Sequence, residues 1–241
     1  MDDNAWIGLL IVGVILLALA GFLGYGAWKR WRWLQTFDAA QEVTAGQAAQ
    51  QRRGLARFSG LAQPGENGEL IAPVSQGPCV YWKYEVKERY RERDSKGRSR
   101  TRTRVVDSGV SDAPFAIADE DGAVMAWPGE VEIHSIQQSA ADSSSVGGLN
   151  LNLGGFQLGG GGTVQTNEWR IAPGTRVYAM GEIAHGDEGS VMLRAGDHAA
   201  LVTGTPLDAF IAKQKRNGLL MAIGAAAALV ALIVAAVVML T

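Results

Sequence analysis

The chain has 241 residues, a hydrophobic fraction of 47% and a formal net charge of −2. This length and apolarity allow one soluble domain together with membrane spans, and the net charge argues against a nucleic-acid-binding chain. One cysteine excludes an internal disulfide, and with only three dispersed histidines it excludes a zinc-finger or RING site within this sequence. No metal and no cofactor are therefore expected.

Two apolar stretches predict transmembrane helices at residues 5–28 and 218–240. In the first, Trp6 to Tyr25 is almost wholly apolar, and about 20 such residues span a bilayer core. A cleaved signal peptide fits this stretch less well, because the start is acidic and no small-residue cleavage site precedes the basic cluster. The second stretch ends one residue before Thr241.

The residues beside the two apolar stretches predict their orientation. Basic residues lie only on the inner flanks, and they are Lys29, Arg30, Arg32, Lys213, Lys215 and Arg216. The outer ends carry Asp2, Asp3 and Thr241. The positive-inside rule therefore predicts a multi-pass protein of the plasma (inner) membrane, with the central region in the cytoplasm and both termini outside.

Between the spans, the pattern predicts one helix followed by many short strands. Leu34, Phe37 and Ala40 repeat at helical spacing and predict a juxtamembrane helix over 29–53. Residues 54–206 alternate strand-like pieces with Gly and Pro turns, and 207–217 is predicted to be a short helix. We therefore expect a mainly β domain of about eight to ten strands, either a small barrel, OB-like in one form, or a sandwich.

Two stretches are expected to build the centre of this domain. A turn bracketed by Pro73 and Pro78 reverses the chain before the strand 79–86. Apolar side chains on both faces at the start of that strand predict a central position. Residues 114–127 predict a hairpin with its turn at 120–122, and Phe115 is expected in the core.

Residues 87–104 carry nine basic and three acidic residues, a net charge of +6 that leaves −8 for the rest of the chain. A turn at 94–97 and arginines at every second position predict a hairpin with the guanidinium groups on one face. These charges either prevent edge-to-edge aggregation of a solvated hairpin or bind anionic headgroups. RNA is a weaker alternative, because Tyr84 and Tyr90 offer stacking but no nucleic-acid motif is present. The candidate contact residues are Arg89, Arg91, Arg93, Lys96, Arg98, Arg100, Arg102 and Arg104.

Residues 139–166 are rich in Gly, Ser and Leu and predict a flexible insertion. A phosphate loop is excluded, because no Lys-Ser/Thr pair follows the glycines and the context is not strand-to-helix.

Three motifs occur in a fixed order: aPvSqGPCVYWKYEV (72–86), PFaIaDedG (114–122) and EWrIaPGtrVYamGE (168–182). With the flanking spans they resemble the GIDE family, also called the BAM ("beside a membrane") domain, over about 44–213. This is the inter-span domain of mitochondrial membrane-anchored RING ubiquitin-protein ligases. The resemblance implies a β-rich domain beside a membrane that recruits or senses partners. The motif residues, expected to be structural, are Pro73, Gly77, Pro78, Cys79, Tyr81, Pro114, Phe115, Asp119, Gly122, Glu168, Gly174, Gly181 and Glu182.

This sequence departs from the ligases because it lacks the RING zinc ligands, as do prokaryotic members of the family. The ligases place the domain in the intermembrane space, whereas the charged flanks here predict the cytoplasm. We expect a membrane-anchored, non-enzymatic interaction or scaffold module that binds a partner protein or anionic lipid, with no DNA partner and no catalytic residue. The alternatives are a ubiquitin-ligase-like protein with a RING supplied in trans, and a Cys79-dependent hydrolase or transferase, which needs an exposed thiol beside a histidine.

Overall fold

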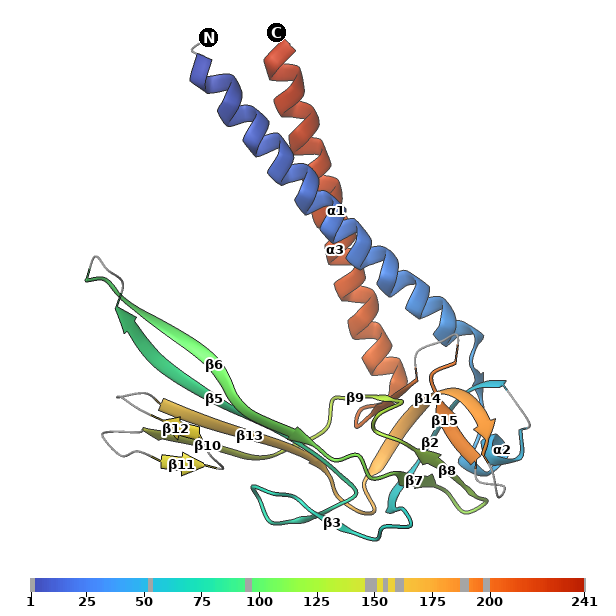
Figure 1. Ribbon diagram of the computed structural model, residues 1–241. Helices are drawn as coiled ribbons and strands as arrows, with labels where there is room; N and C mark the ends of the chain where they lie inside the picture. The colour runs from blue at the N-terminus through green and yellow to red at the C-terminus, as the bar shows by residue number, and fades with distance from the viewer. Residues whose placement is uncertain are drawn as a thin grey trace. The chain divides into compact units, whose positions relative to one another are not determined.

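The structure is a computed structural model that describes residues 3–51, 54–93, 97–145, 151–153, 156–158, 163–186, 191–196 and 200–240 (Figure 1). The chain divides into a helical unit, 1–40 and 206–241, and a β domain, 41–205. The helices are α1 (Asp3–Ala39), α2 (Ala45–Gln50) and α3 (Leu207–Leu240). The strands are β1 (Gln41–Glu42), β2 (Gly54–Pro64), β3 (Leu70–Ile71), β4 (Pro78–Cys79), β5 (Tyr81–Arg93), β6 (Ser99–Val110), β7 (Phe115–Ala118), β8 (Ala123–Ala126), β9 (Glu132–His134), β10 (Gln138–Ser145), β11 (Leu151–Leu153), β12 (Phe156–Leu158), β13 (Thr163–Ile171), β14 (Arg176–His185), β15 (Val191–Arg194) and β16 (Leu201–Thr203).

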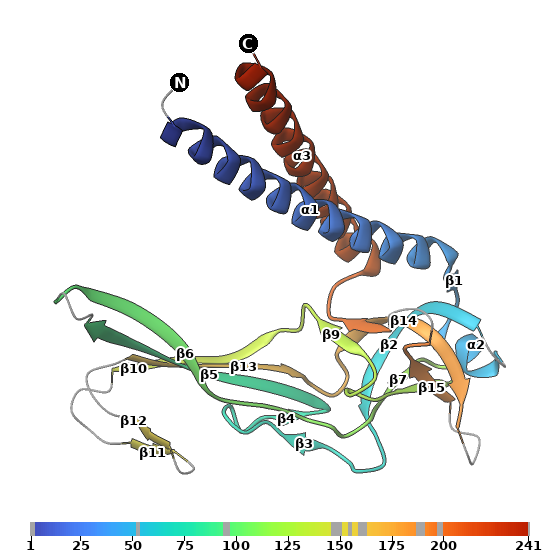
Figure 2. The same cartoon turned by 45° about the horizontal axis from the view of Figure 1, so that its top comes forward.

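The helical unit consists of α1 and α3, which lie side by side with the start of α1 and the end of α3 at the same end (Figures 1 and 2). Glycines allow the close approach: a Cβ on Gly26 would lie 3.2 Å from Sδ of Met221, and one on Gly224 3.2 Å from Leu23. The helix expected at 207–217 is the first part of α3, which continues through Gly218 without a break.

Among the described residues, one helix is long and apolar enough to cross a membrane, by length and composition alone. It covers Leu207–Val234 and reaches a mean hydropathy of 2.3 over a window of 18 residues. Val12–Trp28 is apolar but shorter. The described part of the chain thus shows one candidate span where the sequence predicts two.

The chain between α1 and the barrel differs from the helix expected over 29–53. The first helix continues to Ala39, and a separate short helix, α2, begins after Thr44. Thr44 Oγ1 accepts a hydrogen bond from Gln47 N at 3.1 Å, and Gln47 Oε1 accepts one from Thr44 N at 3.1 Å. This reciprocal capping box favours a new helix start at Ala45 over continuation of α1.

Five strands of the β domain close into a barrel, in the order β2-β7-β8-β15-β14 and back to β2. Every neighbouring pair is antiparallel except β8 and β15, which are parallel. The mainly β fold is confirmed, and the barrel is found rather than the sandwich. Five strands is also the number in an OB-like barrel.

The barrel encloses the main hydrophobic core. Strand β7 contributes four buried residues in succession, and both Phe115 and Ile117 are fully buried. Val124 and Ala126 of β8 are also fully buried. The expectation that Phe115 lies in the core is therefore confirmed. Burial of alternate residues along β2 shows a strand with one face turned to this core.

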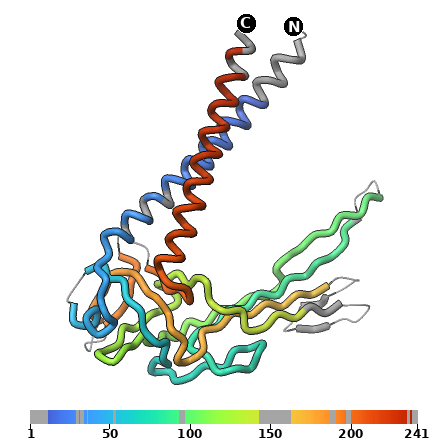
Figure 3. Tube along the Cα trace, turned by 180° about the vertical axis from the view of Figure 1, so that it is seen from behind, coloured from blue at the N-terminus to red at the C-terminus, as the bar shows by residue number. Residues whose placement is uncertain are grey.

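A second sheet has the order β10-β13-β5-β6. Two insertions build it: β5 and β6 lie between barrel strands β2 and β7 in sequence, and β10 and β13 between β8 and β14. Strand β5 pairs on both sides, as expected for a central strand. In Figures 1 and 3 the β5–β6 hairpin continues as a two-stranded ribbon beyond the end of β13.

The segment 139–166, expected to be a flexible insertion, begins and ends in strands of this sheet. β10 pairs antiparallel with β13, from Ser145 opposite Thr163 to Ala140 opposite Glu168. The β-branched residues Thr163, Val164 and Thr166 suit a strand once β5 supplies a partner. The residues 146–150, 154–155 and 159–162 of the expected insertion lie outside the described residues.

Candidate functional site

The arginines of 87–104 lie on the predicted hairpin, but they do not share one face. Arg89 and Arg91 of β5 pair with Thr103 and Thr101 of β6, while Arg100 and Arg102 of β6 pair with Glu92 and Tyr90 of β5. Directly paired residues point to the same side of a sheet. The arginines of the two strands therefore point to opposite faces, and the expectation of a single guanidinium face is wrong.

One face of this hairpin, here called the paired face, carries balanced charges, and two of its three arginines form ion pairs. Arg104 Nε lies 2.7 Å from Oε2 of Glu88, whose side chain is almost wholly buried, and Arg102 Nε lies 2.5 Å from Oε2 of Glu92. The Arg104 guanidinium also lies 5.2 Å from the ring centroid of Tyr90, a cation–π distance. The charged residues on this face are Glu88, Glu92, Arg100, Arg102, Arg104 and Asp107, which sum to zero.

The opposite face, here called the cationic face, carries an excess of positive charge. Its charged residues from Lys83 to Arg91 are Lys83, Glu85, Lys87, Arg89 and Arg91, a net +3, and Arg93 takes the next position of this face by register. Lys87 Nζ lies 2.8 Å from Glu85 Oε2. Within the described ranges no ion pair is found for the exposed Lys83, Arg89 and Arg91.

Three further candidate residues, Arg93, Lys96 and Arg98, lie in sequence at the turn of the hairpin. Arg98 is exposed and precedes β6. Lys96 lies outside the described residues, and Arg93 ends β5 opposite Ser99. Gly97 has φ +77°, a left-handed conformation that suits glycine and agrees with the turn expected there.

Glu168 of β13 forms the centre of a second cluster, here called the Glu168 clamp. Its side chain is fully buried. Its carboxylate accepts hydrogen bonds from Val74 N at 2.6 Å, from Ser75 N at 3.2 Å and from Ser139 Oγ at 2.7 Å. Glu168 thus ties the 73–78 turn and β10 to β13.

The same hydrogen bonds determine the ionisation of Glu168. Burial alone would raise the pKa of this carboxyl, but the Ser139 hydroxyl and the backbone N–H groups of Val74 and Ser75 outweigh it. The net pKa is therefore below its ordinary value, and Glu168 is anionic at neutral pH. A carboxylate with its proton already lost and its oxygens occupied is a structural anion rather than a general acid.

Cys79, the only cysteine, lies beside this clamp and is fully buried. Burial raises the pKa of its thiol; the positive charge of Arg170 opposes this rise and the negative charge of Glu168 adds to it. Its Sγ lies 3.5 Å from the Leu70 carbonyl, to which it donates. The exposed thiol required by the hydrolase or transferase hypothesis is not found.

Gly77 and Arg170 explain the glycine of the first motif. A Cβ on Gly77 would collide with the Arg170 guanidinium, so only glycine leaves that group its position. Nη1 of Arg170 is buried and has no hydrogen-bond partner among the described residues. Pro73 and Pro78 bracket this turn, as the sequence predicts.

Asp119 connects the second motif to α2. Its carboxylate accepts hydrogen bonds from Ala45 N at 2.6 Å and Gly46 N at 3.1 Å, and from Asp121 N and Gly122 N in its own turn. Burial would raise the pKa of Asp119, but these four N–H groups outweigh it and lower the pKa. The turn was predicted from the sequence; the contact with α2 was not, because the two segments lie more than 70 residues apart.

The remaining motif residues also have structural positions. The Tyr81 ring lies 6.5 Å from the Phe115 ring, the Pro114 carbonyl packs against Gly65, and Gly174 has φ +76° in a turn. Gly181 is needed for packing, since a Cβ there would lie 2.8 Å from Ala200 Cβ.

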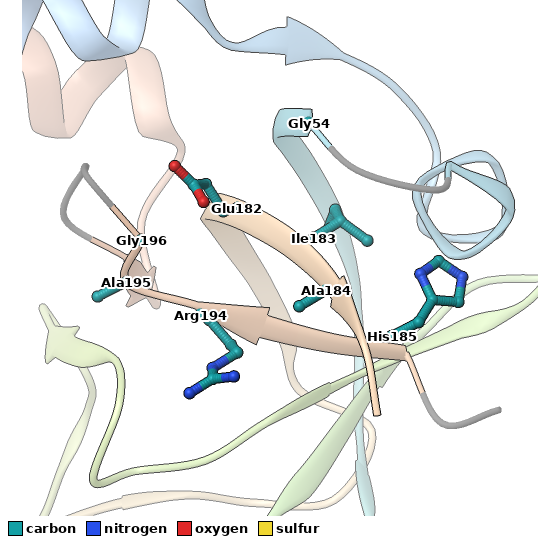
Figure 4. A pocket seen from close by; sticks show the side chains of 8 residues that line it. All are labelled: Gly54, Glu182, Ile183, Ala184, His185, Arg194, Ala195 and Gly196. Atoms are coloured by element: carbon teal, nitrogen blue, oxygen red, sulfur yellow. The ribbon is translucent and has the colours of Figure 1, made fainter. Parts of the chain in front are cut away.

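Glu182 lines a hollow of about 490 Å³ along β14 and β15, with its carboxylate against Gly196 (Figure 4). The other charged groups do not converge with it. Arg194 is bound by Glu130 at 2.9 Å, and His185 lies well apart from Glu182 along β14. The hollow therefore contains no arrangement of acid, base and nucleophile among the described residues.

The described residues also contain no group of three or more His, Cys, Asp or Glu side chains that could hold a metal ion. No cofactor-binding arrangement was identified in the same part of the chain. The two clusters that the geometry does present are the Glu168 clamp, which connects the 73–78 turn to β10 and β13, and the two-faced basic hairpin, which exposes cations.

Comparison with known proteins identifies the family. The model of the GIDE family, described as "E3 Ubiquitin ligase", matches residues 86–238, which is 153 of the 241 residues. No curated protein and no solved structure matches the chain. The matched region contains most of the β5–β6 hairpin, the second and third motifs and most of α3. The chain therefore belongs to the GIDE family.

Proposed function

We propose that this chain is a membrane-anchored interaction module whose β domain binds an anionic lipid surface or a partner protein and performs no catalysis by itself. In this proposal α1 and α3 are two membrane spans, and the β domain lies in the cytoplasm. The charged flanks of the apolar stretches support that orientation. The side-by-side arrangement of α1 and α3, with their outer ends together, fits a helical hairpin.

The observation that carries the proposal is the division of charge on the β5–β6 hairpin. One face carries balanced charges and the other leaves three exposed cations without an ion pair among the described residues. Cationic groups near an anionic leaflet each contribute about 1 kcal/mol to binding. The motif residues, in contrast, are occupied in packing and turns, as expected of structural positions.

The binding function is tested with the full chain held in nanodiscs of neutral phosphatidylcholine, so that its apolar helices are already embedded in lipid. Added vesicles containing phosphatidylserine should co-sediment with the nanodiscs, and the bound fraction should fall as salt rises, because salt screens exposed charges. Vesicles of phosphatidylcholine alone are the control. Equal binding to both vesicles, or none to either, would contradict a lipid-binding domain.

The orientation is tested by labelling cysteines introduced singly at Thr101 or Ser108, both exposed, in a Cys79→Ser background. A membrane-impermeant reagent should label them only after lysis if the domain is cytoplasmic. Labelling in intact cells would reverse the proposed orientation.

The family description favours a second function, participation in ubiquitin transfer. Catalysis would need a RING supplied by another chain, since this sequence has one cysteine and a RING binds zinc through several Cys and His residues. Reconstituted ubiquitin transfer, with and without a separate RING protein, tests this function. Transfer by this chain alone would contradict the non-enzymatic proposal.

A further inference from the structure

We propose that the cationic face of the β5–β6 hairpin, and not its paired face, is the surface that binds anionic lipid headgroups. This assignment rests on the proposed lipid-binding function and specifies which residues perform it. The contacts come from Lys83, Arg89 and Arg91, with Lys87 beside them.

The spacing of these cations suits an extended anionic surface. Residues on one face of a strand recur at every second position, about 6.6 Å apart. Arg89 and Arg91 therefore form a short row, and their partners on β6, Thr103 and Thr101, are exposed hydroxyl residues of the same face. Cations and hydroxyl donors in adjacent rows match phosphate and carboxylate groups presented side by side on a leaflet.

Apolar residues on the same face favour lipid over other anionic partners. Val105 and Val110 of β6 pair with Lys87 and Lys83, and they are 51% and 55% exposed. An exposed valine beside cations fits the boundary between headgroups and hydrocarbon, where apolar and cationic side chains bind together. The long apolar helix α3 belongs to the same chain, and in this proposal it anchors the domain to a bilayer.

The two tyrosines on the outer part of the hairpin argue against nucleic acid as the occupant. Binding of single strands commonly uses exposed aromatic rings on which bases stack. Tyr84 and Tyr90 lie on the paired face, on the other side of the hairpin from the exposed Lys83, Arg89 and Arg91. Tyr84 stacks on Trp82 with ring centroids 5.8 Å apart and donates its hydroxyl to Asp107, and Tyr90 lies under Arg104. The rings are therefore already engaged.

The chain offers a matched pair of variants for the test. Arg89→Gln/Arg91→Gln removes two charges from the cationic face, and Arg100→Gln/Arg102→Gln removes two from the paired face of the same hairpin. Each variant is held in phosphatidylcholine nanodiscs, and its affinity for phosphatidylserine vesicles is measured by co-sedimentation at fixed salt. The first variant should bind about 30-fold more weakly than the wild type, and the second within about threefold. Unchanged near-ultraviolet circular dichroism and thermal midpoint verify that both variants are folded.

The outcomes separate this inference from the proposed function. Equal losses in the two variants would overturn the face assignment and leave charge-driven lipid binding in place. Failure of the wild type to distinguish phosphatidylserine from phosphatidylcholine vesicles would overturn lipid binding itself, and this inference with it. Tighter binding of a single-stranded RNA oligonucleotide, lost in Arg89→Gln/Arg91→Gln, would replace the lipid as the occupant.

Discussion

Replacement of Glu168 tests whether one buried carboxylate holds the 73–78 turn against the four-stranded sheet. The side chain is fully buried and accepts hydrogen bonds from Val74 N, Ser75 N and Ser139 Oγ. Glu168→Ala removes all three acceptor contacts at once. The two backbone N–H groups have no other acceptor among the described residues, so the loss of stability should be concentrated in this turn.

The magnitude follows from the donors that are left without a partner. A buried donor that loses its acceptor costs about 1–3 kcal/mol, which gives about 2–6 kcal/mol for the two N–H groups. Val74 is 37% exposed, so water can solvate part of this backbone. We therefore expect Glu168→Ala to lower the free energy of unfolding by about 2–4 kcal/mol, in the lower half of that range.

Glu168→Gln should destabilise the protein less than Glu168→Ala, because the amide can form the same hydrogen bonds. Its oxygen can keep the Val74 and Ser75 N–H groups, while its NH₂ group donates to the Ser139 hydroxyl, which can turn to accept. Only the charge assistance of these hydrogen bonds is lost, about 1–2 kcal/mol. Ser139→Ala in the Glu168→Gln background should then lower the stability further, since it leaves an amide donor without an acceptor.

The pH dependence has a definite sign. Because the pKa of Glu168 is lowered in the folded protein, the ionised carboxylate contributes its full stability above about pH 4.3, the pKa of an unfolded glutamate. That contribution is lost as the pH falls through the folded-state pKa. The stability difference between wild type and Glu168→Gln should therefore be constant near neutrality and shrink in acid.

Hydrogen exchange of the full chain in detergent micelles measures the effect where it should occur. The amides of Val74 and Ser75 should lose protection in Glu168→Ala by about 30-fold or more, the equivalent of about 2 kcal/mol. The core amides of β7 report global unfolding and serve as the internal reference. Unchanged protection at Val74 and Ser75 would refute the clamp, and a uniform loss throughout the β domain would refute its local character.

Three further substitutions test other parts of the fold. Phe115→Ala should lower the free energy of unfolding, measured in denaturant, by about 3–5 kcal/mol because the ring is fully buried. The exposed control Val110→Ala should change it by less than about 0.5 kcal/mol. Similar values for both variants would show that Phe115 is not a core residue. Asp119→Ala should cost about 1–2 kcal/mol and speed amide exchange at the start of α2, and normal exchange there would contradict the cap. Gly77→Ala should lower the free energy of unfolding by about 1–3 kcal/mol, because the added Cβ collides with Arg170. Arg170→Ala should relieve part of that loss, and strictly additive effects in the double mutant would exclude the collision.

Local patterns in the sequence predict much of the barrel and little of what connects its parts. The apolar run 115–118 and the Asp-x-x-Gly turn are sufficient to predict the β7–β8 hairpin and the burial of Phe115. The clamp is different, because the donors at Val74 and Ser75 and the acceptor at Glu168 are more than 90 residues apart. No spacing rule joins such segments; the register of β13 on β5 brings them together.

The arrangement of the arginines shows how one residue of loop length reverses a prediction. A four-residue turn at 94–97 would place Arg98 opposite Arg93 and unite the arginines of both strands on one face. The structure pairs Arg93 with Ser99, so the loop has five residues. A shift of one residue in register moves every side chain of a strand to the other face. Composition predicts the charge of this hairpin, but only the register determines where it points.

This register also bears on the alternative interpretation, in which the charges only prevent aggregation. Protection of an edge strand needs charges along β6 and is indifferent to the face on which the charges of β5 lie. Here β5 is covered on both sides by β13 and β6 from Lys83 to Arg89, and this covered part carries the cations Lys83 and Arg89, for which no ion pair is found among the described residues. Edge strand β6 has its arginines opposite Glu88, Tyr90 and Glu92. An edge-protecting device would place its unpaired charges on the edge strand. Their position on the covered strand is what a binding face requires, because the pairing on both sides fixes the spacing of the cations before a ligand arrives.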